Sequence, residues 1–440
     1  MRYCIAMICV GLACLAAEAV PASAADWPQW LGPNRDSVWR EDGLLETFPA
    51  SGPKVLWRQS VGGGFAGPAV ADGRVFVMDY LTAESPVPSA SRRDALTGTE
   101  RVLCFSARDG QLLWKHEYDR AYHISYATGP RVTPAVDADR VYTLGAEGDL
   151  KCLRVADGTV VWSRDLPRDY EFETPTWGFA GHPLVDGQKL ICLVGGEGSI
   201  AVAFDKLTGQ EIWRSLSARE TGYSAPAIIQ AGSVRQLIIW HADAVNSLDP
   251  ETGKLYWSEP LDPDWGMAIA TPRTDGTYLF VGGIVMKSLL LRLATDRPAA
   301  EVVWSGRKGV GIAPTSNTPF LADGHMYGVD REGELRCVRL DTGEQLWTTY
   351  AATTTTGSRS DNATAFLVKQ ADRFFIFNEQ GELIIAQLTP AGYHELSRAR
   401  ILDPTLTNYG RQVVWSHPAF AQRCVFARND RELVCVSLAP

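Results

Sequence analysis

The sequence lacks the basic clusters that accompany nucleic-acid binding. It has 42 lysines and arginines against 51 aspartates and glutamates, a formal net charge of −9, and its basic residues are dispersed along the chain. A protein that binds the phosphate backbone presents a basic patch or stripe, so this pattern argues against a nucleic-acid partner. After the first residues, the chain also has no apolar stretch long enough to span a membrane as a helix, which takes about 20 residues.

Familiar catalytic and metal-binding motifs are also missing. The chain has no His-Glu-x-x-His, no Gly-x-Ser-x-Gly, no phosphate-binding glycine loop and no Cys-x-x-Cys pair, and it contains only seven histidines. Each of these motifs places particular side chains at the spacing that its chemistry requires. Their absence removes the most readily recognised classes of hydrolase, metalloenzyme and nucleotide-binding protein.

The first 24 residues are predicted to be a signal peptide. Arg2 supplies the positive charge, residues 5–17 form a short apolar core, and Ala-Ser-Ala at 22–24 has the form of a cleavage site. We expect cleavage after Ala24 and export to the periplasm or the exterior. A lipoprotein with Cys14 as the modified residue is less favoured, because Gly11 stands where a lipobox has leucine or a similar residue.

A motif that ends in tryptophan recurs along most of the chain. Five segments read Gly-x-x-x-Trp and end at Trp114, Trp162, Trp213, Trp257 and Trp347. Trp304 has a similar context, with Ala300 in place of the glycine. A small residue precedes each tryptophan by ten positions, and the pattern continues twice without the tryptophan. These eight positions are Cys104, Cys152, Ala203, Ser247, Ala294, Cys337, Ala386 and Cys435. Their spacing of 43 to 51 residues is typical of one four-stranded propeller blade per repeat.

Each repeat has the pattern of four short strands. An inner strand follows a small or polar residue, often with proline next, as at Thr133-Pro134. A second strand, a third strand and an outer strand with the tryptophan follow, separated by turns. The eighth repeat lacks an outer strand, whereas Trp57 ends an outer strand that has no repeat before it. We therefore predict an all-β, eight-bladed β-propeller of four-stranded antiparallel blades, closed by the N-terminal strand. Residues 25–53 would form a lead-in segment, and residues 54–440 a single propeller domain.

These motifs resemble a known repeat family. The pattern small-x-Asp-x-x-x-Gly-x-x-x-Trp, clearest at Ala203 to Trp213, is similar to the tryptophan-docking repeat of PQQ-like β-propellers, which include PQQ-dependent dehydrogenases and the BamB-type assembly protein. The resemblance covers residues 54–438, and residues 27–35 look like the lead-in of exported bacterial members. It implies that the tryptophans dock between adjacent blades. The predicted docking residues are Trp57, Trp114, Trp162, Trp213, Trp257, Trp304 and Trp347.

The resemblance implies two kinds of function, since one fold supports many. PQQ dehydrogenases carry a disulfide between adjacent cysteines over the cofactor, with calcium ligands and an aspartate base. This chain has no adjacent cysteines and is shorter than those enzymes. We predict no cofactor and no metal, with PQQ and calcium less favoured, and we assign no catalytic residue. The leading hypothesis is a monomeric binding or scaffold module for a protein, a cell-surface polymer or a small ligand. The alternative is a divergent quinoprotein or another enzyme that uses the channel mouth.

The cysteines favour buried thiols over a disulfide framework. Four of the six that follow the signal peptide occupy the small-residue position in different blades, where free cysteine is a good buried apolar residue. Cys424 and Cys435 are predicted to lie opposite each other across a turn at Asn429-Asp430. This leaves one disulfide open, although a two-residue turn would make the two a hydrogen-bonded pair with distant side chains.

Candidate ligand-binding residues gather in the loops that lead from an outer strand to the next inner strand. Three such loops are long and aromatic, and an insertion at residues 79–101 falls between the second and third strands of the first blade. In a propeller these connections share one face, here called the loop-rich face, and long loops on a rigid scaffold often carry binding residues. The candidates on this face are Tyr126, Arg131, Trp177, Tyr223, Trp265 and Arg359.

Two histidines are further candidates. His182 and His417 each precede a proline at the start of an inner strand, so both are expected near the channel mouth. There they would act as ligands or bases. In the alternative interpretation, each fills the position that threonine holds in other blades, such as Thr133 and Thr271, and bonds to local backbone.

Overall fold

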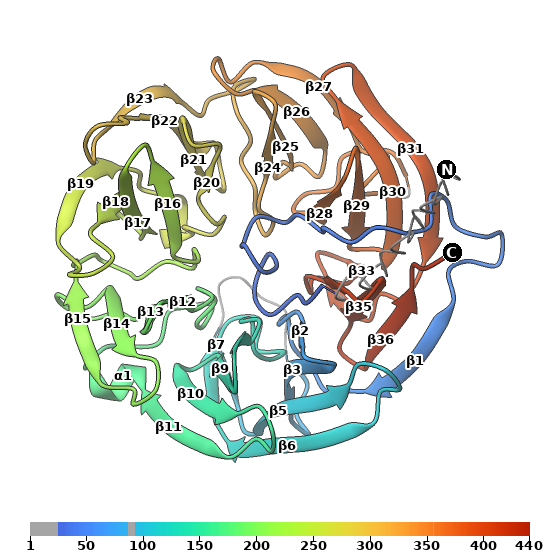
Figure 1. Ribbon diagram of the computed structural model, residues 1–440, viewed down its shortest axis with the longest axis horizontal. Helices are drawn as coiled ribbons and strands as arrows, with labels where there is room; N and C mark the ends of the chain where they lie inside the picture. The colour runs from blue at the N-terminus through green and yellow to red at the C-terminus, as the bar shows by residue number, and fades with distance from the viewer. Residues whose placement is uncertain (1–24, 87–92, 355) are drawn as a thin grey trace, which may run out of the picture.

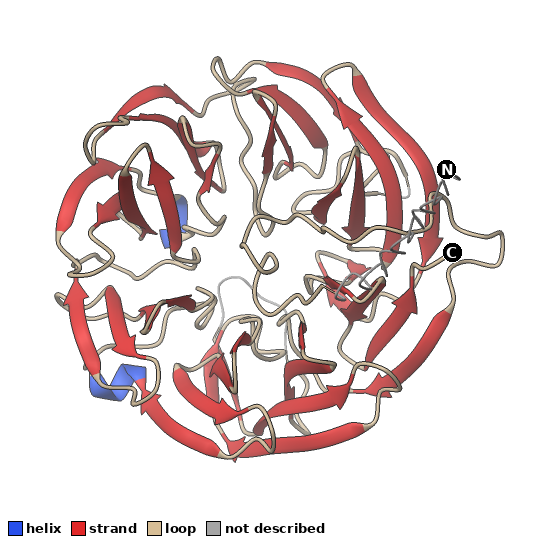
Figure 2. Cartoon of the chain, in the orientation of Figure 1, coloured by secondary structure: helices blue, strands red, loops and turns tan. Residues whose placement is uncertain are grey.

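The computed structural model describes residues 25–86, 93–354 and 356–440, so the predicted signal peptide lies outside the described residues. Eight four-stranded antiparallel sheets stand as blades around a central channel (Figure 1), which confirms the predicted eight-bladed β-propeller. Strands dominate the chain, with one short helix, α1 (Leu166–Asp169), and a 3₁₀ helix, η1 (Asp264–Gly266), in the described part (Figure 2). No helix in the described residues is long and apolar enough to cross a membrane.

Each blade begins at a short inner strand beside the channel and ends at an outer strand on the rim (Figure 1). Blade one contains β2 (Ala69–Ala71), β3 (Arg74–Leu81), β5 (Thr99–Ser106) and β6 (Leu112–Asp119). Blade two contains β8 (Ala135–Asp137), β9 (Arg140–Leu144), β10 (Asp149–Arg154) and β11 (Val160–Asp165). Blade three contains β12 (Leu184–Asp186), β13 (Lys189–Leu193), β14 (Ala201–Asp205) and β15 (Glu211–Ser215). Blade four contains β16 (Ala227–Ala231), β17 (Val234–Trp240), β18 (Ala244–Leu248) and β19 (Leu255–Pro260).

The second half of the ring repeats this order. Blade five contains β20 (Arg273–Thr274), β21 (Tyr278–Gly283), β22 (Lys287–Leu293) and β23 (Ala300–Ser305). Blade six contains β24 (Phe320–Ala322), β25 (His325–Val329), β26 (Leu335–Arg339) and β27 (Gln345–Thr349). Blade seven contains β28 (Ala365–Gln370), β29 (Arg373–Asn378), β30 (Glu382–Thr389) and β31 (Gly392–Arg400). Blade eight contains β34 (Ala419–Ala421), β35 (Cys424–Arg428), β36 (Glu432–Ser437) and β1 (Val55–Ser60).

Burial along the strands follows from the position of each strand in its blade. Every residue of β13 is buried, because neighbouring blades cover both faces of a middle strand. In the outer strand β15 only Trp213 is buried, and the rest of the strand faces solvent or the rim. The core is therefore a series of layers between blades, and each layer needs apolar residues from two consecutive repeats.

The ring closes as predicted. The N-terminal strand β1 pairs antiparallel with β36, and Trp57 lies opposite Cys435. This places the outer strand of blade eight at the start of the propeller and the other three strands at its end. The two ends of the chain thereby complete one sheet, which leaves no half-built blade with an exposed edge.

Six of the seven predicted docking tryptophans share one contact between blades. The indole of Trp213 donates a hydrogen bond to the carbonyl of Pro250 (3.3 Å), and a Cβ added to Gly253 would lie 2.6 Å from its ring. The glycine is therefore required by the close approach of the indole. The equivalent donor and carbonyl pairs are Trp57–Ala107, Trp114–Val155, Trp162–Lys206, Trp213–Pro250, Trp304–Leu340 and Trp347–Thr389. Trp257 differs, because its indole donates to the Gln236 Oε1 of its own blade (2.9 Å).

Three details of the sequence interpretation are wrong, and the first concerns a small-residue position. The small-residue position of blade five was expected at Ala294, but Leu290 lies opposite Trp304. The hairpin between β22 and β23 is longer than in the other blades, and the Ala294 N–H instead bonds to the carbonyl of Ala299 at its tip (2.9 Å). The position ten residues before Trp304 is therefore not its strand partner in this blade. The same hairpin contains Ala300, the residue found in place of the glycine.

The cysteine register also differs from the expectation. Cys424 lies opposite Ser437, and Cys435 lies opposite Phe426, so the two cysteines are diagonal neighbours on adjacent strands. All six cysteines of the described residues are buried free thiols. Burial raises the pKa of Cys104 and Cys152 to about 12, which keeps these two thiols protonated and unreactive.

The insertion in blade one is shorter than predicted. Asp79 and Arg101 are strand partners joined by an ion pair (2.6 Å), so the segment that leaves the sheet is residues 82–98. Within it, β4 (Asp94–Leu96) pairs with β7 (Tyr122–Ile124), which lies in the loop that follows blade one. Residues 87–92 of this predicted insertion lie outside the described residues. The pairing of β4 with β7 holds residues 94–96 against the loop that follows blade one.

Candidate functional site

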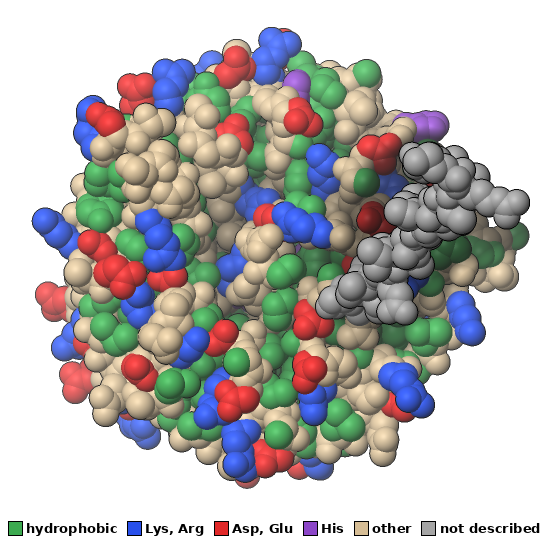
Figure 3. Space-filling view, in the orientation of Figure 1, with side chains coloured by type: hydrophobic (Ala, Val, Ile, Leu, Met, Phe, Trp, Pro, Cys, Tyr) green, Lys and Arg blue, Asp and Glu red, His purple; other side chains and the backbone are tan. Residues whose placement is uncertain are grey.

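The lead-in segment, residues 25–53, crosses the central channel (Figure 1). Trp27 exchanges backbone hydrogen bonds with Val70 of β2 (2.8 and 2.9 Å), and Lys369 of β28 bonds to both Ser37 and Trp39 (2.9 and 2.8 Å). These contacts satisfy the inner edges of blades one and seven, which would otherwise face an open channel. Figure 3 shows the face on which the lead-in lies, with Lys and Arg side chains near its centre. This face carries the turns between first and second strands.

Trp30 fills the channel. Its indole stacks on His182 with ring centroids 3.9 Å apart, lies 4.7 Å from the ring of His417, and donates to Thr271 Oγ1 (2.9 Å). These three partners occupy the same position in three different blades, two residues before an inner strand. One indole therefore joins three blades at the axis of the ring.

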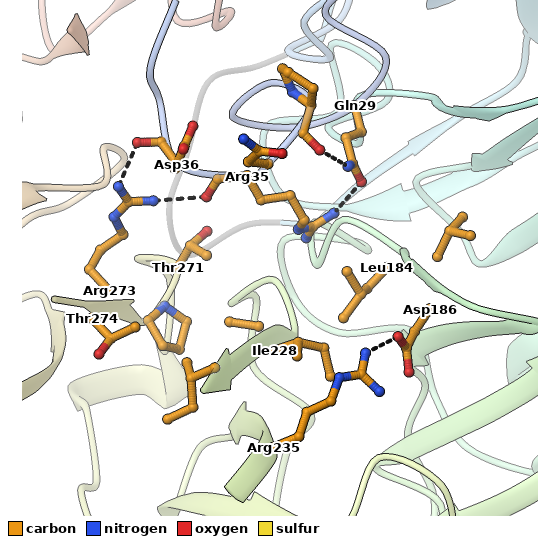
Figure 4. Close-up of a pocket in the computed structure, with 16 residues that line it drawn as sticks. Gln29, Arg35, Asp36, Leu184, Asp186, Ile228, Arg235, Thr271, Arg273 and Thr274 are labelled. Atoms are coloured by element: carbon orange, nitrogen blue, oxygen red, sulfur yellow. Dashed lines mark hydrogen bonds and ion pairs between the residues drawn. The ribbon is translucent and has the colours of Figure 1, made fainter. Parts of the chain in front are cut away.

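Two arginines fix the lead-in segment to the blades by hydrogen bonds to backbone carbonyls (Figure 4). Arg35 donates to the carbonyls of Pro183 (3.0 Å) and Pro226 (3.3 Å), and Arg273 donates to the carbonyls of Arg35 (2.8 Å) and Asp36 (2.7 Å). Burial lowers the pKa of Arg35 and of Arg273 to about 10, so both remain cations at neutral pH. The channel is thus closed from the lead-in side by packing and by hydrogen bonds to backbone.

The two candidate histidines belong to this closure. The backbone N–H of Thr133 donates to His182 Nδ1 (3.0 Å), so His182 bonds to backbone as in the alternative from sequence, but to that of the neighbouring blade and not to local backbone. Burial lowers the pKa of His417 to about 4, and burial with the nearby Arg35 and His417 lowers the pKa of His182 well below its usual value. Both rings are therefore neutral at pH 7, packed against Trp30, and neither lines the channel mouth.

A cavity opens on the other side of the closure, at the loop-rich face. It has a volume of about 1020 Å³ and continues into a pocket of about 220 Å³. The two spaces share Tyr126, Trp177, Met267, Thr315, Asn362 and Tyr409. We call the larger space the mouth cavity and the smaller one the axial pocket. Both are lined by loops between outer and inner strands, the mouth cavity also by Ile284 and Arg331 of turns between second and third strands, and together they form one site.

The axial pocket is a layer of the ring to which seven of the eight blades contribute the same position; the equivalent residue of blade seven, Asp361, lines the mouth cavity instead. Its wall contains residues that stand four positions before an inner strand: Phe65, Arg131, Ala180, Tyr223, Ile269, Ser316 and Trp415. The positions two residues further along include His182, Thr271 and His417, which hold Trp30. Two residues of extended chain span about 6–7 Å, so the Trp30 layer lies directly beneath the axial pocket. The pocket is therefore blind, with entry from the loop-rich face.

The pocket presents mostly apolar surface. The Trp415 ring lies 6.5 Å from Phe65, 6.4 Å from Tyr126 and 6.2 Å from Tyr409, and Trp177 lies 5.6 Å from Tyr223. Several polar atoms bond to one another. The pairs are Tyr126 with Tyr409 through their hydroxyls (3.4 Å), Thr315 with Asn362 (3.2 Å), and the Trp177 N–H with the Tyr223 hydroxyl (3.5 Å). What remains for a ligand is ring surface.

The predicted residues divide into three groups. Tyr126, Trp177 and Tyr223 line the axial pocket, and Trp265 lines the mouth cavity with 63% of its surface exposed. Arg131 also lines the pocket, but its guanidinium is committed to the protein. It donates to the carbonyls of Ser125 (2.8 Å), Tyr126 (2.7 Å) and Gly129, and lies 5.3 Å from the Phe65 ring centre.

Arg359 lies outside the lining of both spaces. Its guanidinium forms ion pairs with Glu332 (3.0 Å) and Asp361 (2.8 Å) on the surface of the same face. Together with His182 and His417, it is a candidate that the fold does not bring to the cavity.

Sequence reasoning missed several lining residues. Phe65, Ile269 and Trp415 were not singled out, although each stands four residues before an inner strand. That fixed offset was available in the repeat itself and would have identified them. Tyr409 was missed for another reason, because it lies in the turn of a small ribbon, β32 (Leu406–Asn408) paired with β33 (Arg411–Val413), that has no counterpart in the repeat.

The donor set does not fit a calcium-bound quinone. None of the residues that line the axial pocket is a carboxylate, and no two cysteines are adjacent in the sequence. In the described part of the chain, no group of three or more His, Cys, Asp and Glu side chains is arranged to hold a metal ion. Glu220 lines the mouth cavity and accepts hydrogen bonds from the Thr176 N–H and the Tyr223 hydroxyl. Burial raises the pKa of its carboxyl, and this effect outweighs the two hydrogen bonds, which lower it. That carboxyl is already engaged by the protein.

The fold places the chain among eight-bladed propellers with tryptophan-docked, PQQ-like repeats. A family model described as "Outer membrane protein assembly factor BamB" matches residues 98–239 and 241–440, and the chain belongs to this family.

Individual relatives are distant. The chain is 23% identical over 285 residues to outer membrane protein assembly factor BamB of Yersinia pestis, which covers 62% of this chain and 67% of that protein. The BamB structure of Moraxella catarrhalis superposes with a TM-score of 0.53 at 15% identity, over 86% of this chain and 96% of that one. The structure of a quinohemoprotein alcohol dehydrogenase from Comamonas testosteroni superposes with a TM-score of 0.57 at 14% identity, over 93% of this chain and 80% of that one. At these identities the structural matches establish the fold alone.

Proposed function

We propose that the protein is an exported, non-enzymatic scaffold that binds a partner protein at the mouth cavity and axial pocket. The observation that carries the proposal is the blind, aromatic-lined pocket that Trp30 creates by closing the channel below it. Protein interfaces concentrate binding energy in apolar pockets that accept an anchoring side chain, surrounded by a polar rim. The relatives named as assembly factors support a partner protein rather than a substrate.

Exposed aromatic residues on the rim support the same proposal. Trp265 is 63% exposed and Tyr409 is 53% exposed, and both line the mouth cavity. A tryptophan or tyrosine left in solvent is available to bury a large area when a partner binds. Single exposed aromatics are common on protein surfaces, but these two stand over one cavity.

The backbone at the mouth is strained. Tyr126, Trp265, Asn362 and Tyr409 all have left-handed backbone, with φ of 50°, 57°, 59° and 47°. This conformation costs about 1–2 kcal/mol for a residue with a side chain. Such strain clusters at binding and catalytic sites, where the side chain must be presented in a fixed direction. Four strained residues around one cavity support its use as a recognition site.

The enzymatic alternative requires acid, base or metal chemistry in the same pocket. The pocket wall offers rings, an amide and hydroxyls, and its arginine is bonded to backbone carbonyls. In the mouth cavity, Asp262 pairs with Arg219, Asp361 pairs with Arg359, and Glu220 accepts hydrogen bonds from the Thr176 N–H and the Tyr223 hydroxyl. Export, predicted from the first 24 residues, is the remaining part of the proposal.

Affinity capture tests the proposal. The mature protein, immobilised, is exposed to an envelope extract of its host, beside Trp177→Ala and an opposite-face control, Asp323→Ala. Asp323 lies in the turn between β24 and β25. We expect a protein that the wild type and Asp323→Ala retain and that Trp177→Ala loses. Equal retention by all three would contradict the proposal, and so would alcohol oxidation after reconstitution with PQQ and calcium.

A further inference from the structure

A second groove beside the mouth cavity carries unpaired positive charge. It has a volume of about 450 Å³ and lies between blades five and six. Four basic and two acidic side chains line it: Arg307, Lys308, Arg331, Arg336, Asp330 and Glu332. We call this space the basic groove. It stands out because the whole chain carries a net charge of −9.

Both acidic residues of the groove are already neutralised. Asp330 pairs with Arg336 (2.7 Å), and Glu332 pairs with Arg359 (3.0 Å). Among the described residues, no carboxylate forms an ion pair with Arg307, Lys308 or Arg331. Arg307 and Lys308 are therefore exposed cations without a paired carboxylate, and Arg331 has only the more distant charge of Asp361 near it, which favours an anionic group in the groove.

The basic groove continues the proposed binding site. Arg331 lines both the groove and the mouth cavity, so one guanidinium stands on their common wall. Its Nε is buried and has no hydrogen-bond partner. A buried N–H of a charged group without an acceptor is unfavourable.

The mouth cavity itself is lined by more carboxylates than cations, and most of these carboxylates are engaged by the protein. They are Glu220, Asp262, Asp264 and Asp361, of which Asp361 pairs with Arg359. Arg219 pairs with Asp262 and Asp243, and Glu220 bonds to the Thr176 N–H. The positively charged part of the site is thus the basic groove, and its most apolar part is the axial pocket. A ligand that uses both must place an apolar group and negative charges side by side.

We propose, on the basis of the scaffold function above, that the partner presents an acidic polypeptide segment with a large aromatic or aliphatic side chain. The apolar side chain enters the axial pocket, and the neighbouring carboxylates lie in the basic groove. An apolar cavity of about 150 Å³ holds a benzene-sized molecule, so a pocket of about 220 Å³ has room for one ring side chain. An acidic polysaccharide fits less well, because its hydroxyls would lose water without gaining partners among the rings.

Synthetic peptides test this assignment directly. The probe is a fluorescein-labelled peptide in which four glutamates are joined through two glycines to a tryptophan. Two matched peptides replace either the tryptophan by alanine or the glutamates by glutamine, and polygalacturonate serves as the polysaccharide probe. Fluorescence anisotropy is measured at low and at high salt, since salt weakens the contribution of the exposed charges.

Two variants separate the two halves of the site. The double change Arg307→Gln with Lys308→Gln removes groove charge, and Arg108→Gln with Lys254→Gln removes two cations on the turns between third and fourth strands, on the opposite face. Ala180→Leu adds volume inside the axial pocket without deleting a contact. Thermal melts of all variants check that the ring remains folded.

We expect saturable binding of the probe, weakened about tenfold or more by either peptide replacement. The groove variant should remove the salt dependence of the affinity, and Ala180→Leu should remove the affinity gained from the tryptophan of the peptide. The opposite-face pair should change neither contribution to the affinity. The assignment is overturned by no saturable binding below about 1 mM, by equal binding of the glutamine peptide, or by preferential binding of polygalacturonate. If the peptide fails while the host protein is still lost only from Trp177→Ala, the scaffold function stands and the acidic ligand is wrong. If both fail, the scaffold function is wrong as well.

Discussion

Trp30 stacks on His182 with the two ring planes 9° from parallel and the centroids 3.9 Å apart. The tryptophan comes from a segment that precedes the first strand, and the histidine comes from the start of blade three. This contact closes the channel and makes the axial pocket a blind site. It also explains why the histidine is neutral, because a stacked and buried imidazole loses the hydration that its cation needs.

Removal of the Trp30 ring should raise the pKa values of His182 and His417, which lie beneath the axial pocket. In Trp30→Ala, water gains access to His182 and His417, and we expect both pKa values to rise toward the ordinary value of about 6.5. Histidine resonances followed by NMR across pH 4 to 8 measure this. Trp265→Ala, on the loop-rich face, should leave the resonances unchanged. Unchanged titration in Trp30→Ala would show that other groups bury the two rings.

The buried histidines should make the fold sensitive to mild acid. The pKa of His417 is about 4 in the folded chain and about 6.5 when unfolded, so below pH 6.5 the unfolded chain binds more protons. The stability from neutral His417 is fully present above pH 6.5 and is lost as the pH falls toward 4. At pH 5 the free energy of unfolding should therefore be lower by about 2 kcal/mol than at neutral pH. His182 acts in the same direction.

Denaturant unfolding at pH 7 and pH 5 measures this loss. His417→Gln should reduce the difference between the two pH values, whereas the exposed His394→Gln should not. A wild-type unfolding free energy that is equal at both pH values would refute the role of the buried rings.

The docking tryptophans should carry much of the stability of the ring. Trp213 is 8% exposed, covers Gly253 and bonds to the Pro250 carbonyl, so Trp213→Ala should lower the free energy of unfolding by about 3–5 kcal/mol. The neighbouring Ile212 is 47% exposed, and Ile212→Ala should change it by less than about 0.5 kcal/mol. Urea melts compare the two. A loss below about 1 kcal/mol for Trp213→Ala would mean that the indole does not join the blades.

The fold was predictable because each repeat carries its own evidence of the same blade. The tryptophan, the glycine and the small residue recur, and a single outer strand at Trp57 without a repeat could only complete blade eight. The prediction failed locally at Ala294, where four extra residues in one hairpin shift the count. A spacing rule has no means of detecting an insertion that preserves the strand pattern on both sides.

The site was predictable only in part. Long aromatic loops led to Tyr126, Trp177 and Tyr223, since loop length and composition are visible in sequence. The role of Trp30 was not visible, because its contacts with His182 and Thr271 span more than a hundred residues and depend on the closed ring. The charge state of Arg131 was predictable, but its bonds to three local carbonyls were not, because they depend on the loop conformation.

Photo-crosslinking in the host cell tests the central claim, that partners bind at the loop-rich mouth, most directly. A benzoylphenylalanine placed at Trp265 stands over the mouth cavity, and one placed at Asp323 stands in a turn on the opposite face. We expect a discrete protein adduct from position 265 that disappears when Trp177→Ala is added, and none from position 323. Adducts from position 323 alone, or adducts from position 265 that persist in Trp177→Ala, would contradict the account.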